Sequence, residues 1–177
     1  MAGITLDEAK RQLRLTPSNT SQDEEIKGFL ADAQAWVTGY TGFLFSTQAV
    51  TEEFRVPGRR IELRSWPVKP GAVVTVSYPD TNGNPAIFQG ARVQFDAGRV
   101  SLTPLSGRGW PLLDTSQSLT ITTEAGLPDG VAVPGEIRRA VLMLIGAYDD
   151  DREGGDTIAK AEATARRLCR RFRQGGL

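Results

Sequence analysis

The hydrophobic pattern of the chain has a helical period near both ends and a strand period in the middle. In residues 26–40 apolar side chains recur three or four positions apart, and the same spacing returns in residues 137–148. Between residues 48 and 125 the helical period gives way to seven short β-rich runs separated by turn residues. The pattern predicts an α+β fold, a bundle of amphipathic helices carrying an inserted antiparallel β-subdomain.

Capping signals predict where the first helices begin and end. Thr5 is followed three residues later by Glu8, the spacing of a capping box, and this predicts a short first helix. Ser21 and Glu24 repeat the spacing before a longer second helix. Gly42 stands just past the last periodic residue of that helix, where a left-handed cap is expected.

The chain is expected to have four parts. They are an N-terminal helical part (1–47), a β-rich subdomain (48–126), a third helix packing on the N-terminal helices (127–155) and a basic C-terminal helix or arm (156–177). Gly154 and Gly155 are interpreted as a hinge before the last part, because glycine leaves the backbone free to turn. Trp36 and Tyr148 are expected to be largely buried between the two long helices.

Three loop positions of the β-subdomain are candidates for an interface. Asn82 and Gly83 form a hairpin-type turn, and Trp66 and Trp110 each precede a proline between predicted strands. A tryptophan in a loop can anchor a partner, but a tryptophan folded back over a sheet is at least as common.

Composition removes most kinds of catalytic chemistry. The 177 residues include no histidine and one cysteine, Cys169. Triads that depend on histidine, histidine metal sites and cysteine zinc sites therefore cannot form within this sequence. The glycine-rich phosphate and dinucleotide motifs are also missing from it. We expect no enzymatic activity and no cofactor.

One acidic cluster could in principle bind a hard cation. Asp149, Asp150, Asp151 and Glu153 lie close together in the sequence DDDRE, and carboxylate oxygens are the ligands of Mg²⁺ and Ca²⁺. Consecutive carboxylates at a helix end more often form a solvated face. We therefore expect no metal site.

The sequence predicts neither secretion nor a membrane span. The N-terminal MAGITLDEAKRQ meets acidic residues at once, unlike a secretory signal. The longest apolar run, AVLMLIGAY at 140–148, is too short to cross a bilayer.

The C-terminal segment is basic although the chain as a whole has 21 basic and 21 acidic residues. Residues 156–177 hold Lys160 and five arginines against Asp156 and Glu162, which is six minus two, or plus four. The apolar positions of this segment recur at three and four and are Ile158, Ala161, Ala165, Leu168 and Phe172. The arginines cover the rest of the helix and are Arg166, Arg167, Arg170, Arg171 and Arg173.

This segment is the candidate docking site, and several partners fit its pattern. Docking to a protein would bury the apolar seam and pair the arginines with acidic groups. A nucleic-acid arm would pair them with phosphates, and a membrane-surface helix would insert the seam into lipid. The remaining possibility is a solvated helix packed on its own domain.

Six motifs in order along the chain resemble the head-to-tail connector, or adaptor, family of long-tailed bacteriophages, which has relatives in prophages and gene transfer agents. The motifs are ITLDEAKRQLRL, DEEIKGFLADAQAWVTGYTG, IELRSWPV, VVTVSYPDTNG, GRGWP and VPGEIRRAVLMLIGAYDDDRE, and they span residues 4–153.

The resemblance implies a structural protein of the virion neck, made in the bacterial host cytoplasm. It implies a ring of copies, twelve in the family, that assembles under the portal protein after DNA packaging and joins it to a stopper, head-completion or tail-terminator protein. Packaged DNA would pass through the ring without sequence-specific binding, and no membrane would be involved. The family uses a C-terminal helix or arm against the portal, which implies that role for residues 156–177.

Overall fold

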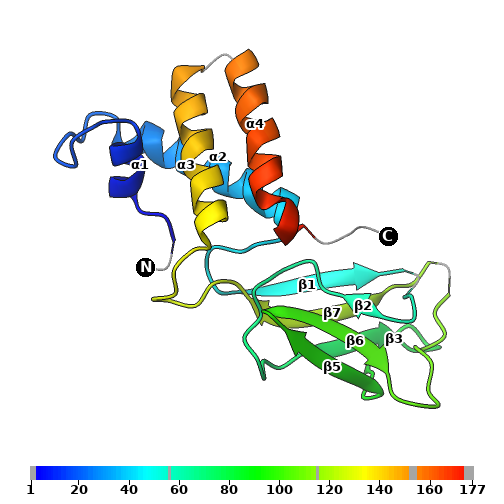
Figure 1. Cartoon of the computed structure of the whole chain (residues 1–177). Coiled ribbons are helices and arrows are strands. Elements are labelled where there is room, and N and C mark those ends of the chain that lie inside the picture. The colour runs from blue at the N-terminus through cyan, green and yellow to red at the C-terminus, as the bar shows by residue number, and fades with distance from the viewer. Residues whose placement is uncertain (1–2, 56, 115, 152–154, 174–177) are drawn as a thin grey trace. The chain divides into compact units, whose positions relative to one another are not determined.

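The computed structural model describes residues 3–55, 57–114, 116–151 and 155–173. These residues form two compact units (Figure 1). The helical unit comprises Met1–Phe45 and Pro128–Leu177, and the β unit comprises Ser46–Leu127. The sheet-forming segment is thus inserted between two helical segments, and the α+β class predicted from the sequence is confirmed.

Three helices surround α3 in the helical unit. The elements are α1 (Leu6–Gln12), α2 (Asp23–Thr41), α3 (Gly135–Asp150), α4 (Asp156–Cys169) and a short 3₁₀ helix, η1 (Arg170–Phe172). Helix α3 contacts α1, α2 and α4, and Figure 1 shows α3 and α4 running side by side with α2 crossing them. The α2–α3 packing predicted from the two apolar stripes is confirmed.

The start of α1 has the predicted capping box. The Thr5 hydroxyl accepts a hydrogen bond from the backbone N–H of Glu8, and the Glu8 carboxylate accepts one from the backbone N–H of Thr5, both at 3.2 Å. Two N–H groups that a helix start leaves without a partner are thereby satisfied.

The second predicted capping box is wrong. The cap of α2 is Gln22, and no side chain caps it. The Asn19 carboxamide oxygen instead accepts hydrogen bonds from both the hydroxyl and the backbone N–H of Ser21, while Glu24 pairs with Lys27 at 2.6 Å. Asn19 thus occupies the Ser21 hydroxyl that the capping box would have used. Asparagine side chains commonly form such local hydrogen bonds in turns.

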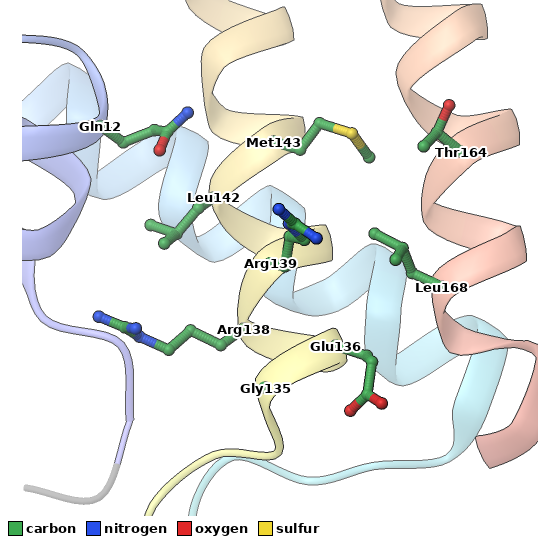
Figure 2. A pocket seen from close by; sticks show the side chains of 9 residues that line it. All are labelled: Gln12, Gly135, Glu136, Arg138, Arg139, Leu142, Met143, Thr164 and Leu168. Atoms are coloured by element: carbon green, nitrogen blue, oxygen red, sulfur yellow. The ribbon is translucent and has the colours of Figure 1, made fainter.

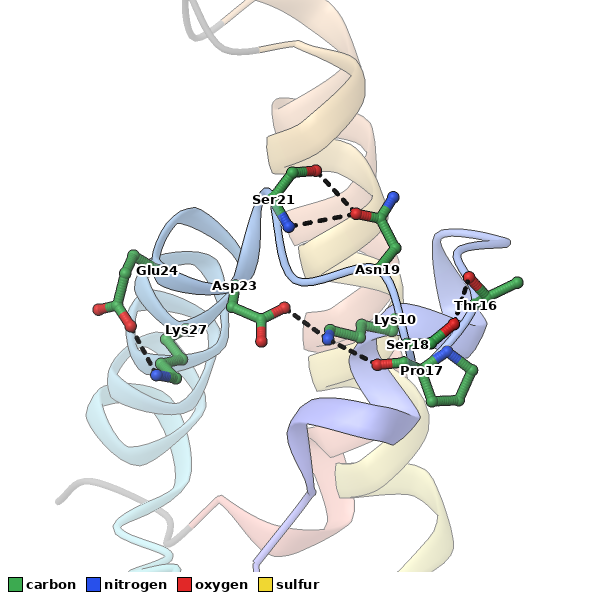
Figure 3. A network of polar contacts seen from close by, with 9 residues as sticks. All are labelled: Lys10, Thr16, Pro17, Ser18, Asn19, Ser21, Asp23, Glu24 and Lys27. Carbon is green, nitrogen blue, oxygen red and sulfur yellow. Dashed lines mark hydrogen bonds and ion pairs between the residues drawn. The ribbon is translucent and has the colours of Figure 1, made fainter.

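A buried lysine ties the loop between α1 and α2 to both helices (Figure 3). Lys10 is 2% exposed, yet its Nζ lies 2.5 Å from a carboxylate oxygen of Asp23 and donates a hydrogen bond to the carbonyl of Pro17 at 3.1 Å. The charge is therefore buried together with an anion and an acceptor, the condition under which a buried ammonium is tolerated.

The core of the helical unit is aliphatic. The two longest helices supply most of it. Their buried apolar residues are Ile26, Ala33 and Val37 in α2 and Ile137, Ala140, Val141, Leu144 and Ile145 in α3. Gly42 ends α2 in the left-handed conformation, with φ of 74°, as predicted. Trp36 and Tyr148, however, are only half-buried, because both lie at the edge of this core. The expectation that they fill it is wrong.

The β unit contains two antiparallel sheets. The strands are β1 (Gln48–Phe54), β2 (Ile61–Glu62), β3 (Thr75–Pro79), β4 (Pro85–Ile87), β5 (Ala91–Asp96), β6 (Arg99–Pro104) and β7 (Leu119–Ala125). The first sheet has the order β1-β7-β3-β4 and the second β2-β6-β5. Within the β unit the first and last strands pair, with Gln48 opposite Ala125, so the inserted segment enters and leaves through neighbouring strands.

Gly126, which follows β7, cannot carry a side chain. Its φ is +128°, and a Cβ there would lie 1.9 Å from the carbonyl oxygen of Ser46. Its own N–H donates a 2.7 Å hydrogen bond to the carbonyl of Pro67. Three segments of the β unit therefore meet at one glycine.

Candidate functional site

Helix α4, the predicted docking element, is packed on its own unit. Ala161, Ala165 and Cys169 recur every four residues, and all three are buried where α4 contacts α3 and α2. Two of the five residues of the predicted apolar seam, Ala161 and Ala165, are thus covered within the chain. Ile158, Leu168 and Phe172 are half-buried and remain partly accessible.

Of the two residues predicted to form a hinge, the structure describes Gly155. Gly155 precedes α4 with ordinary extended backbone angles, and a Cβ on it would lie 2.7 Å from a carboxylate oxygen of Asp151. The clashing atoms are the end of a flexible side chain, so they do not by themselves require glycine here, and α4 after it is packed on α3 and α2. Gly154, the other predicted hinge residue, lies outside the described residues.

The arginines of α4 and η1 divide into two groups by their neighbours. Arg171 forms an ion pair with Glu136 of α3 at 2.7 Å. Arg166 pairs with Glu162 at 3.1 Å.

Two of these cations also lie against the aromatic side chains of α2. Trp36 and Tyr40 are stacked with ring centroids 5.6 Å apart. The Arg166 guanidinium lies 5.8 Å from the Trp36 ring centre, and that of Arg173 lies 5.5 Å from the Tyr40 ring centre. These contacts are within cation–π range and fasten α4 to α2.

The other group points away from the bundle. Four exposed residues lie on the side of the helix opposite the buried alanines. They recur at spacings of three, four and three and are Lys160, Ala163, Arg167 and Arg170. We call these four residues the outer face of α4. Within the described part of the chain, no ion pair is found for the charged side chains of this face.

A groove runs between α1, α3 and α4 on another side of the unit (Figure 2). Its volume is about 940 Å³, and its lining residues are Gln12, Gly135, Glu136, Arg138, Arg139, Leu142, Met143, Thr164 and Leu168. Leu142, Met143 and Leu168 give it an apolar floor, and Arg139 is an exposed cation on it. A floor of leucine and methionine beside cations is suited to an amphipathic, acidic protein segment.

Arg138, which also lines the groove, is paired with a carboxylate. Arg138 contacts the Glu8 carboxylate at 2.5 Å and joins α3 to α1. Burial alone raises the pKa of Glu8, but the hydrogen bonds from Arg138 and from the Thr5 backbone outweigh it and leave that pKa below its ordinary value of 4.5.

The thiol of Cys169 is not accessible to a substrate or a reagent. It is fully buried, and burial, with a smaller contribution from Glu136, raises the pKa of its thiol to about 11. A thiol with so little thiolate at neutral pH is a poor nucleophile.

The candidate loop residues of the β unit have different surroundings. Trp66 is buried and covered by the Arg99 guanidinium, 4.6 Å from its ring centre, so it belongs to the core and does not reach the surface as an anchor. Trp110 is half-buried: its Nε1–H donates to the carbonyl of Gly58 at 2.7 Å, and its ring lies 5.6 Å from that of Phe88.

Asn82 and Gly83 are at the exposed tip of the β3–β4 hairpin. The Asp80 carboxylate organises this tip by accepting hydrogen bonds from the backbone N–H groups of Asn82 and Asn84, both at 2.8 Å. Gly83 has a φ of +82°, as a tight turn requires. The predicted hairpin is confirmed, with a loop longer than two residues.

The acidic cluster is spread over the end of α3 and the segment after it. Glu153 lies outside the described residues. Among the residues that the structure describes, no group of three carboxylate, cysteine or histidine ligands is placed to hold a metal ion.

The sequence comparison covers the N-terminal third of the chain. Residues 3–62 match the family described as phage gp6-like head-tail connector protein. The matched segment includes α1, α2 and the first two strands, so it contains the helix that carries Trp36 and Tyr40.

Solved structures show a likeness of fold over nearly the whole chain. A chain of the "Neck of empty GTA particle computed with C6 symmetry" is 21% identical, with a TM-score of 0.74 over 99% of this chain and 91% of that one. A chain of the "Virion of native gene transfer agent (GTA) particle" is also 21% identical, with a TM-score of 0.71 and the same coverage.

A third match is to the "Neck of native GTA particle computed with C12 symmetry", at 20% identity and a TM-score of 0.66, covering 100% of this chain and 94% of that one. At these identities the matches show a shared fold. No curated protein matches the chain significantly. Among the described residues, no helix has both the length and the apolar character needed to span a membrane.

Several residues of the groove were not predicted from the sequence. Three of them lie on α3 and are Arg139, Leu142 and Met143. Only the apolar face of this helix that packs on α2 was predicted from the sequence. Cys169 was also missed, although its spacing of four from Ala165 and eight from Ala161 could have placed it in the buried row.

Proposed function

We propose that this chain is a structural virion protein, a head-to-tail connector that joins a DNA-filled head to the tail. The observation that carries the proposal is the combination of two likenesses in one chain. The connector-family match lies in residues 3–62, and the fold of chains in GTA neck and virion structures extends over nearly all of the sequence. The working place of the protein is then the neck of the particle.

In this role the chain is one subunit of a ring. The matched neck structures were computed with C6 and C12 symmetry, which supports a cyclic arrangement, and we propose twelve copies. Neighbours in such a ring meet through unlike faces, and the ring closes when the rotation between them does.

The portal protein is the proposed partner at one end of the ring, and a stopper, head-completion or tail-terminator protein at the other. Of the residues first considered for portal docking, we assign this role to Leu168 in the groove, together with Arg139 and Met143. Ala161 and Ala165 are excluded from it because they are buried within the helical unit. The groove would take an acidic segment of the portal, which its leucine–methionine floor and its cations favour.

A nucleic-acid-binding arm is a weaker explanation of the arginines. Arg166, Arg171 and Arg173 are engaged by carboxylates or aromatic rings of the helical unit, which leaves a smaller cationic surface than the sequence suggests. Tight phosphate binding would also oppose the passage of DNA through a ring. No enzymatic activity is proposed.

Binding to DNA-free portal rings tests the proposal. The full chain should co-sediment with purified rings of the portal protein from the same particle. Arg139→Glu should weaken binding, since it puts a like charge against an acidic partner. Arg14→Glu, an exposed reversal outside the groove residues, is the matched control. A full chain that does not bind the rings would contradict the proposed function.

A further inference from the structure

We propose that neighbouring copies of this chain contact each other through their helical units, with the outer face of α4 in one copy lying over an acidic pocket in the next. The inference rests on the proposed function, which requires a ring, and it names the two surfaces that form the contact. Both surfaces belong to the same compact unit, so their positions can be compared directly.

The acidic pocket lies between α2, the end of α3 and the start of α4. Its volume is about 250 Å³, and it is lined by Glu25, Phe29, Asp32, Tyr148, Asp151 and Ile158. The rings of Phe29 and Tyr148, with centroids 6.3 Å apart, make its apolar floor. Carboxylates around an apolar floor match the two parts of an arginine side chain, the guanidinium and the aliphatic stem.

Two carboxylates of the pocket, Asp32 and Asp151, carry its unpaired negative charge as far as the described residues show. Among the described residues, no ion pair is found for Asp32 or Asp151. Asp151 follows the C-terminus of α3, and its carboxylate lies beside Gly155, the cap of α4, so the positive end of the α4 dipole offsets the negative end of the α3 dipole there. Burial raises the pKa of Tyr148, and the charges of Glu162 and Asp32 raise it further, as expected for a phenol among carboxylates.

The outer face of α4 supplies the matching cations. Arg167 and Arg170 are exposed, and within the described residues they have no acidic partner, unlike Arg166 and Arg171. Arginine binds carboxylates through two parallel hydrogen bonds, which fixes orientation as well as charge. Each copy therefore has an excess of cations on one surface and of anions on another.

The shapes of the two surfaces allow close approach. The exposed residues of α2 include Gly28, Ala31 and Ala35 beside the charged Glu24, Lys27 and Asp32, and the space in front of Gly28 is open. On the other surface Ala163 stands between the charged residues of the outer face. Small residues on both helices let their backbones come close, so that long arginine side chains can reach the pocket.

A contact of this kind is heterologous. The pocket and the outer face are different surfaces, so each copy uses one toward each neighbour and leaves none unused when a ring closes. A second copy is the occupant that the charges favour, because the complementary surface is present on the same chain.

Charge reversal tests the pairing in the full chain. Asp32→Lys/Asp151→Lys and Arg167→Glu/Arg170→Glu should each lower self-association by about tenfold or more, because like charges then face each other. Mixing the two variants should restore association, since each supplies the charge that the other has lost. Asp129→Lys and Arg14→Glu, exposed reversals away from both surfaces, are the controls. Circular dichroism verifies folding, and Asp32→Lys alone replaces the double variant if Asp151→Lys unfolds.

Cross-linking captures the contact even when it is transient. Copies carrying Asp32→Cys are mixed with copies carrying Arg167→Cys and treated with a short bis-maleimide, free in solution and on portal rings. The native Cys169 is buried and should not react. We expect mixed dimers in excess of those formed with Arg14→Cys as the control.

The outcomes separate this inference from the proposed function. The proposed contact is overturned, and the connector role left intact, if the chain binds the portal without an excess of mixed cross-links. The same holds if the charge-reversed variants assemble like the unmodified chain. Mixed cross-links without portal binding would support the contact and count against the connector role.

Discussion

Lys10 is a charged side chain that the helical unit buries almost completely. Its ion pair with Asp23 and its hydrogen bond to Pro17 connect α1, the loop after it and the start of α2. The sequence did not predict this role, since a lysine in a short amphipathic helix is expected to be solvated. The loop buries it because a carboxylate and a carbonyl come within reach only in the folded chain.

Lys10→Ala should lower the free energy of unfolding by about 3 kcal/mol, because it leaves the Asp23 carboxylate partly buried without its cation. Urea unfolding followed by circular dichroism measures the change. Lys27→Ala, which breaks the exposed pair with Glu24, is the control and should leave stability nearly unchanged. Equal losses in the two variants would mean that the burial of Lys10 contributes nothing.

The Glu8–Arg138 pair should make the helical unit sensitive to acid. The pKa of Glu8 is lower in the folded protein than its ordinary value of 4.5, so folding favours the ionised carboxylate. This contribution to stability is fully present above pH 4.5 and is lost as the pH falls through the folded pKa. Urea unfolding at a series of pH values should show a weaker acid dependence in Glu8→Gln and in Arg138→Ala than in the unmodified protein. An unchanged slope in both would reject the pair as its source.

At the scale of elements, α4 shows what periodicity can and cannot predict. Its spacing of three and four correctly predicted a helix with an apolar side. Periodicity does not say what covers that side, and here α3 and α2 cover it. The Thr5–Glu8 box and the failed Ser21–Glu24 box make the same point, because only the second had an asparagine close enough to compete.

Ala165→Leu should destabilise the helical unit by about 1–3 kcal/mol, since Ala165 is fully buried between packed helices and the larger side chain does not fit. Ala163→Leu, two residues away on the outer face, is the matched control and should change thermal stability little. If both variants melt alike, the packing of α4 on α3 is not as described.

Deleting residues 156–177 should also destabilise the helical unit, because it uncovers α3.

Gly126→Ala should destabilise the β unit by about 3 kcal/mol or more, because it combines a disfavoured φ with a clash against the Ser46 carbonyl. Gly71→Ala is the comparison: its φ is +82° but the space around it is open, so only the backbone cost of about 1 kcal/mol applies. The difference between the two variants, measured by thermal melting, isolates the clash. No difference would mean that the β7 end can relax.

At the scale of the whole molecule, the order of motifs predicted the fold class and the connector resemblance. The groove was not predictable, because it collects residues of α1, α3 and α4 that are far apart in the sequence. The sequence did show that residues 156–177 carry an excess of four positive charges. It did not show which of these cations are paired within the helical unit, because their partners lie on α2 and α3.

The most direct test of the connector role is electron cryomicroscopy of portal rings incubated with the full chain. We predict added density at one end of the portal, in a ring of twelve copies, with the α1–α3–α4 groove against the portal. Arg139→Glu should reduce occupancy of the ring, and Arg14→Glu should not. Portal rings without added density at saturating concentrations of the chain would contradict the account.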